Sequence, residues 1–148
     1  MAYTSPVSTY KETKVKTASQ GQLILMLYDE AVKQLDRGLE LLGQDTGAKK
    51  NPDNIEKISK AILKAQEIVT ELTVSLDFEQ GGDIAKNLFS LYTWFNKELV
   101  ESHISHDIRR ITQVRNQLSE LKSAWAEVAA RNSSETAGKA VTGVNIAG

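Results

Sequence analysis

One stretch of the chain carries apolar residues at intervals that alternate strictly between three and four positions. The residues of this stripe are Ile55, Ile58, Ile62, Ala65, Val69, Leu72 and Leu76. Such residues share one face of an α-helix, and the alternation is typical of helices that pack together at a shallow angle. Pro52 follows Asn51, an order that favours a helix start. We therefore predict a helix over residues 52–76, ended by the stretch 77–82.

Three other segments have a helical period and predict helices over residues 19–42, 83–102 and 105–130. The last of them repeats the alternation of three and four, through Ile111, Val114, Leu118, Leu121, Trp125 and Val128. Ser19 and Gln22 fit a capping box at the start of the first. No segment alternates as a strand does. Four helices with short connections predict an all-α fold, an antiparallel up-and-down four-helix bundle.

The chain of 148 residues is long enough for one domain with a substantial core. We expect this bundle to occupy residues 17–130. Residues 1–16 are polar and are expected to form a flexible N-terminal arm. Residues 131–148 have no period, and a segment that cannot bury apolar area does not offset its ordering entropy. We expect it to be a disordered C-terminal tail.

The composition excludes several classes of protein. The net charge is -1 and no long basic stripe exists, so nucleic acid is not an expected partner. The absence of cysteine excludes disulfides, thiol catalysis and Cys-based zinc sites. The N-terminus lacks the apolar core of a secretion signal, and no apolar run approaches the roughly 20 residues that cross a bilayer. We expect a cytoplasmic protein without membrane insertion.

The histidines offer little chemistry. Both His103 and His106 lie at the predicted turn between the third and fourth helices, with Asp107 beside them. A di-iron bundle needs inward-facing Glu-x-x-His pairs, and neither histidine follows a glutamate by three positions. A phosphotransfer bundle needs a histidine in the middle of a helix, and Gly81-Gly82 lacks the Lys-Ser/Thr of a phosphate loop. We predict no metal, no cofactor and no catalytic residue, and hence a protein that is not an enzyme.

Apolar residues exceed the needs of the core stripes at two places. Residues 23–28 are six apolar residues in a row, and Phe89, Leu91 and Trp94 lie off the stripe of the third helix. A bundle buries a wide face of each helix, which can account for most of them. Apolar residues left exposed would mark an interaction surface. Tyr10 is an isolated aromatic residue in the polar arm, either solvated or folded back over an apolar groove.

On these residues the sequence resembles the FliS family of flagellin export chaperones. The resemblance is carried by Tyr10, Thr17-Ala18-Ser19, Gln22-Leu23-Ile24, Met26-Leu27-Tyr28-Asp29, Lys60-Ala61, Ile68, Leu72, Ser75-Leu76-Asp77, Asn87-Leu88, Leu91-Tyr92, Leu99, Asp107 and Ala124-Trp125. These residues span most of the chain, and their combination is more specific than any one of them.

The resemblance implies a cytosolic bundle that binds the disordered C-terminal segment of flagellin, prevents its premature polymerisation and delivers it to the flagellar type III export apparatus. It also implies that the arm occupies part of the client groove, with Tyr10 as the plug. The candidate partner-binding residues are Tyr10, Leu23, Leu27, Tyr28, Leu91 and Tyr92. The alternative is a structural or regulatory bundle that associates weakly with itself and has no flagellin client.

Overall fold

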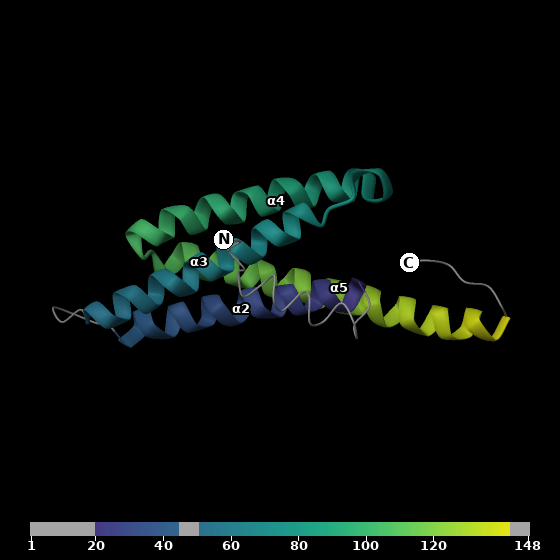
Figure 1. Cartoon of the computed structure of the whole chain (residues 1–148), viewed down its shortest axis with the longest axis horizontal. Coiled ribbons are helices and arrows are strands. Elements are labelled where there is room, and N and C mark those ends of the chain that lie inside the picture. The colour runs from purple at the N-terminus through teal and green to yellow at the C-terminus, as the bar shows by residue number, and fades with distance from the viewer. Residues whose placement is uncertain (1–19, 45–50, 143–148) are drawn as a thin grey trace, which may run out of the picture.

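The computed structural model describes residues 20–44 and 51–142, with side chains described as far as Arg131. These residues form four helices: α2 (Gln20–Gln44), α3 (Pro52–Val74), α4 (Phe78–Ser105) and α5 (Ile108–Thr142) (Figure 1). No strand occurs in the described part of the chain. The predicted all-α class and the four-helix bundle are therefore confirmed.

The helices run alternately in opposite directions and pack in chain order around a common core (Figure 1). Helix α2 packs against α3 and α5, and α4 packs against the other side of α3 and α5. Figure 1 shows α4 and α5 close together where they are joined and further apart towards the start of α4. This divergence leaves one end of the bundle less tightly closed than the other.

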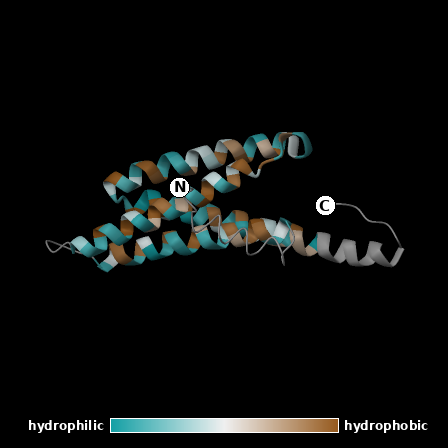
Figure 2. Ribbon diagram, viewed as in Figure 1, coloured by the Kyte–Doolittle hydropathy of each residue, from teal (hydrophilic) through white to brown (hydrophobic). Residues whose placement is uncertain are grey.

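The apolar stripes predicted from spacing form the core. Its largest fully buried side chains include Tyr28, Leu35, Ile58, Ile62, Ile68, Leu72, Tyr92, Phe95, Leu99, Ile111 and Leu118. Burial weakens at the helix ends, where Ile55 is 39% exposed and Leu76 only packs against the edge of the core. Figure 2 shows that hydrophobic and hydrophilic residues recur alternately along each helix. No helix in the described ranges is long and apolar enough to cross a membrane.

At the start of three helices, a side-chain oxygen accepts hydrogen bonds from backbone amides of the first turn. The Asn51 Oδ1 atom accepts a hydrogen bond from the Asp53 amide at 3.0 Å. The Asp77 Oδ1 atom accepts from the amides of residues 79 and 80, both at 3.0 Å. The Asp107 Oδ1 atom accepts from the Arg109 amide at 3.0 Å. These caps fix where α3, α4 and α5 begin. Asp107, which lies beside His103 and His106 in the sequence, therefore serves as the N-cap of α5.

Helix α4 starts earlier than predicted, because Asp77 caps an extra first turn at Phe78. Within the break predicted over residues 77–82, the structure has this helical turn and then a kink at Gly82. Gly82 has φ 49° and ψ -123°, a conformation that side-chain-bearing residues rarely adopt. The turn before Gly82 therefore changes direction relative to the rest of α4.

Helix α5 also differs from its prediction, because it continues to Thr142 instead of ending near residue 130. The sequence explains this in part, since no proline interrupts residues 131–142. Figure 1 shows this last part projecting beyond the other helices. The flexible arm, the Ser19 cap and Tyr10 lie outside the described residues. The disorder expected from residue 131 does not agree with the helix over residues 131–142, whereas the disorder of residues 1–16 and the domain division at residues 17 and 130 stay predictions.

Candidate functional site

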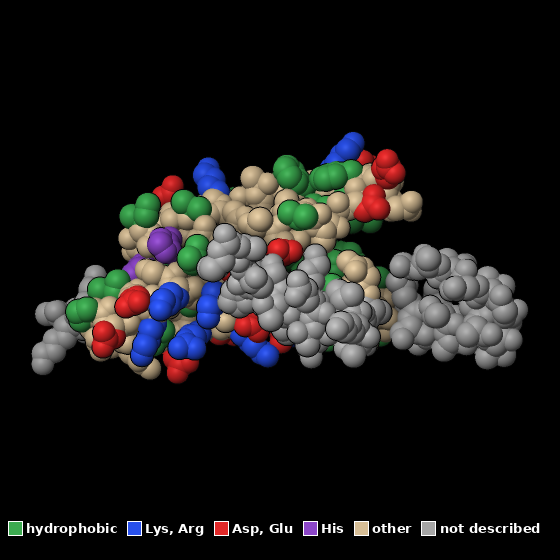
Figure 3. Space-filling model, viewed as in Figure 1, with side chains coloured by type: hydrophobic (Ala, Val, Ile, Leu, Met, Phe, Trp, Pro, Cys, Tyr) green, Lys and Arg blue, Asp and Glu red, His purple; other side chains and the backbone are tan. Residues whose placement is uncertain are grey.

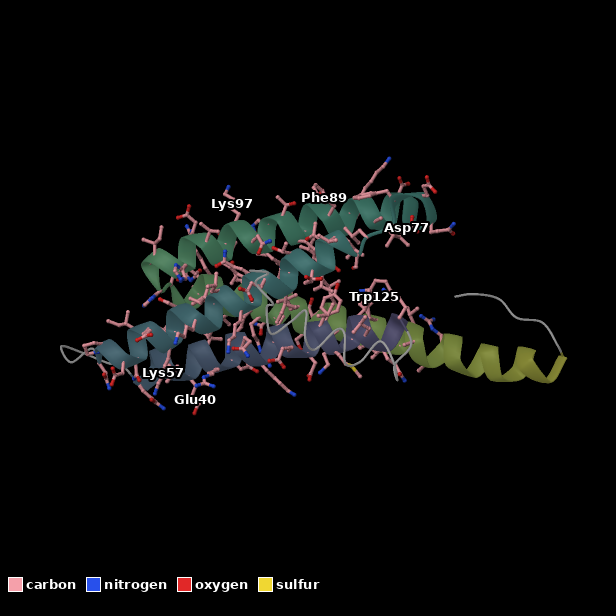
Figure 4. All side chains as sticks on the ribbon, viewed as in Figure 1. Glu40, Lys57, Asp77, Phe89, Lys97 and Trp125 are labelled. Atoms are coloured by element: carbon pink, nitrogen blue, oxygen red, sulfur yellow. The ribbon has the colours of Figure 1, made fainter. Side chains whose placement is uncertain are left out.

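An open cavity of about 260 Å³ lies at the end of the bundle where α4 and α5 diverge. Its apolar wall is formed by Ile24, Leu76, Ile84, Ala85, Leu88 and Trp125. Ser75, Asp77 and Gln80 contribute polar groups to the lining, and Tyr92 comes from further along α4. Figure 4 shows Trp125 of α5 and Asp77 at this same end of the bundle. A cavity of 150 Å³ already holds a benzene molecule, so this one has room for one or two apolar side chains.

Small residues keep the cavity open on the α4 side. Ala85 is buried and lines the cavity, and the kink at Gly82 folds the first turn of α4 close to it. A Cβ atom on Gly81 would lie only 2.8 Å from the Cβ atom of Ala85. A larger residue at either position would therefore displace the turn or fill the cavity. The kink and the small residues together shape this wall.

Three aromatic residues from three helices meet beside the cavity. The hydroxyl groups of Tyr28 on α2 and Tyr92 on α4 are within hydrogen-bonding distance of each other. The Trp125 Nε1 atom on α5 donates a hydrogen bond to the Tyr28 hydroxyl at 3.2 Å. Burial raises the pKa of both tyrosines above its ordinary value. Both hydroxyls are therefore protonated at neutral pH and bring no charge to the cavity.

An ion pair ties α2 to α5 one residue away from this cluster. The Lys122 Nζ atom lies 2.7 Å from the Asp29 Oδ1 atom, and the Lys33 Nζ atom lies 3.0 Å from Oδ2. Hydrogen bonds from Lys122 and then Lys33 lower the pKa of Asp29 below its ordinary value. The Asp29 and Lys122 side chains are 36% and 39% exposed, so water screens the pair.

Asp29→Asn should lower the free energy of unfolding by at most about 1 kcal/mol at neutral pH, because the pair is exposed. The folded-state pKa of Asp29 lies below the unfolded value, so its contribution is complete above that unfolded value, about 3.9. The contribution disappears as the pH falls through the lower folded-state pKa. Denaturant titrations over a pH series should therefore show wild type and variant converging in acid. A difference that stays constant over the series would contradict this assignment.

The matched control is Glu120→Gln on α5, because Glu120 is exposed and makes no ion pair among the described residues. This control should unfold like the wild type near neutral pH.

Exposed apolar side chains lie on the first half of α4, and one of them also lines the cavity. Ile84 lines the cavity and is still 67% exposed. Phe78 and Phe89 are 48% and 45% exposed, and their ring centroids lie 5.9 Å apart in an edge-to-face arrangement. Figure 3 shows hydrophobic side chains gathered on this outer side of α4. Exposed apolar side chains near an open cavity are typical of a site that binds another chain.

The candidate partner-binding residues predicted from the sequence do not all lie at the cavity. Leu23 and Leu27 are each only 2% exposed, and Leu27 belongs to the core. Neither side chain is exposed in the free protein, and the part of both residues in partner binding stays a prediction. Leu91 packs partly buried against the core. Tyr10 lies outside the described residues. Tyr28 and Tyr92 do come together, and Tyr92 lines the cavity.

Apolar excess does not indicate that Ile24, Leu88 and Trp125 line a cavity, because these residues belong to the predicted core stripes. A signal for them was present, because the segments that carry the resemblance converge here. Leu91-Tyr92 and Ala124-Trp125 each contribute an aromatic residue, and Ser75-Leu76-Asp77 forms part of the lining. The motif residues therefore mark the cavity better than apolar excess alone does.

In the described ranges no three His, Cys, Asp or Glu side chains gather where they could hold a metal ion. His103 is exposed near the end of α4, far along that helix from the cavity. The absence of any cofactor and of catalysis stays a prediction.

Comparisons with known proteins place the chain in a family. The model of the family described as flagellar protein FliS matches residues 3–132. The flagellar secretion chaperone FliS of Salmonella typhimurium is 35% identical over 122 residues, which cover 82% of this chain and 85% of that protein. FliSB of Pseudomonas aeruginosa, also a flagellar secretion chaperone, is 36% identical over 114 residues, with coverages of 77% and 84%. FliS of Bacillus subtilis is 25% identical over 127 residues, with coverages of 86% and 88%. The chain therefore belongs to the FliS family of flagellar proteins.

Proposed function

We propose that this chain is a cytoplasmic export chaperone that binds the disordered C-terminal segment of flagellin. The observation that carries the proposal is the open apolar cavity beside Tyr92 and Trp125, continued onto α4 by the exposed Ile84. The names of its relatives, flagellar secretion chaperones, support the same role. Covering the segment would prevent premature polymerisation until the client reaches the flagellar type III export apparatus.

The apolar character of the site suits a disordered client. A disordered segment loses conformational entropy when it binds, and apolar burial must compensate for that loss. Fully burying one isoleucine or phenylalanine side chain contributes about 1.5–3 kcal/mol. The cavity lining and the exposed side chains of Ile84, Phe78 and Phe89 supply several such apolar groups on the first half of α4. Binding of this kind needs no catalysis, so we propose a chaperone that is not an enzyme.

Calorimetry with monomeric flagellin of the same organism tests the proposal. The full-length flagellin should bind, and flagellin without its C-terminal segment should not. Equal binding of both forms would contradict the proposal that this segment is the client. If neither form binds, the proposed function itself fails.

The alternative is self-association without a flagellin client, and exposed apolar residues where α4 ends and α5 begins favour it as the second candidate. Ile104 and Ile108 are 83% and 51% exposed there. Sedimentation equilibrium of the chain alone distinguishes the two functions, because only the alternative requires a dimer.

A further inference from the structure

The hydrogen bonds of the aromatic cluster have a direction that can be deduced. An indole N–H can only donate, so the bond between Trp125 and Tyr28 runs from Trp125 Nε1 to the Tyr28 oxygen. A tyrosine hydroxyl can accept and also donates one proton. Between Tyr28 and Tyr92, either hydroxyl group could donate its proton to the other.

Tyr28 has a single available acceptor. Its side chain is completely buried, and the Tyr92 oxygen is the only acceptor within hydrogen-bonding distance of its hydroxyl in the described part of the chain. If Tyr92 donated to Tyr28 instead, the Tyr28 proton would be buried without an acceptor. Leaving a buried donor unsatisfied is costly, so the arrangement in which Tyr28 donates to Tyr92 is favoured.

The proton of the Tyr92 hydroxyl is then not used inside the cluster. Tyr92 is itself only 2% exposed, but it lines the cavity, whereas Tyr28 does not. The chain of hydrogen bonds therefore runs from Trp125 through Tyr28 to Tyr92 and ends with a donor at the cavity. Ile24 and Leu88, which precede Tyr28 and Tyr92 by one helical turn, also line the cavity and add only apolar surface there.

We propose that the Tyr92 hydroxyl is a specificity-determining donor that hydrogen-bonds an uncharged oxygen of the client. This rests on the proposed function, and it adds the chemistry that the cavity selects. The fitting ligand is an apolar side chain next to an amide oxygen, either a side-chain amide or a free backbone carbonyl at a helix end. A carboxylate fits poorly, because it would be desolvated in an apolar cavity that Asp77 also lines.

Calorimetry with flagellin tests this through Tyr92→Phe, which keeps the ring and removes the donor. Binding should weaken about tenfold, because the client oxygen is then buried without a partner. Tyr28→Phe is the matched control, since it disturbs the same buried cluster but leaves the Tyr92 donor in place. Its binding should weaken clearly less than that of Tyr92→Phe, although both variants melt at lower temperature.

A second variant keeps the test independent of folding. In Tyr92→Phe the hydroxyl proton of Tyr28 has no acceptor, which could lower the stability of the bundle. The double variant Tyr28→Phe/Tyr92→Phe lacks both hydroxyl groups and so leaves no buried donor unsatisfied. The double variant should bind as weakly as Tyr92→Phe alone. Equal affinity of wild type and Tyr92→Phe would overturn this inference and leave the proposed function intact. Equal losses in Tyr28→Phe and Tyr92→Phe would also overturn it, because they would indicate a purely structural cluster.

Alanine substitutions of the Asn and Gln residues in the client segment separate the two sources of the amide oxygen. If one of them weakens binding to wild type but not to Tyr92→Phe, the acceptor is that side chain. If none does while Tyr92→Phe still binds weakly, the acceptor is a backbone carbonyl.

Discussion

Ile84→Asp should weaken binding of the flagellin C-terminal segment on the order of a hundredfold or more and leave the bundle folded. Ile84 is 67% exposed in the free protein, so an aspartate there stays solvated and the melting temperature should not change. In the complex the client would cover the carboxylate at the cavity. Leaving a buried charge without a partner costs about 3–5 kcal/mol. Calorimetry and thermal melts of the same preparation measure both effects.

Ile104→Asp is the matched control for this prediction. Ile104 is on the same helix, is the same residue type and is 83% exposed, but it lies at the other end of α4. A helix rises about 1.5 Å per residue, so the two positions are about 30 Å apart. The control should bind flagellin as the wild type does. If both variants lose affinity equally, or neither does, the cavity is not the main binding site.

Leu27→Asp should instead destabilise the bundle itself by about 3–5 kcal/mol, because it places an unpaired carboxylate in the core. Leu27 is 2% exposed and packs in the main core cluster. Denaturant unfolding measures the loss. Leu63→Asp is a suitable control on α3, since Leu63 is 49% exposed and its replacement should be nearly neutral. A Leu27→Asp protein that is as stable as wild type but no longer binds flagellin would return Leu27 to the client groove.

The difference between Ile84 and Leu27 illustrates what the sequence can predict here. Helix α3 has one stripe with a strict period, so its buried residues Ile58 and Ile62 follow from spacing alone. The first turns of α2 are apolar on every side, so spacing carries no information about which side faces inward. Packing against α3 and α5 decides that Leu23 is buried and that Ile24 lines the cavity.

Other parts of the site depend on contacts between residues far apart in the chain. Tyr28 and Tyr92 are 64 positions apart and Tyr28 and Trp125 are 97, so no local pattern indicates that they meet. The family resemblance marked all three without giving a reason. Gly82 was recognisable as a break, but the extra capped turn before it, which forms part of the cavity wall, requires the Asp77 cap geometry. Local chemistry therefore predicted the elements, and the cavity arises from how they are arranged.

Site-specific photo-crosslinking tests most directly the central claim that the client occupies this cavity. A photoreactive amino acid replaces Ile84 in one variant and Ile104 in the other, and each full chain is irradiated with flagellin of the same organism. Mass spectrometry then locates the linked residues. The cavity assignment predicts that position 84 links to the C-terminal segment of flagellin and that position 104 does not. Efficient linking at position 104 with none at position 84 would contradict it.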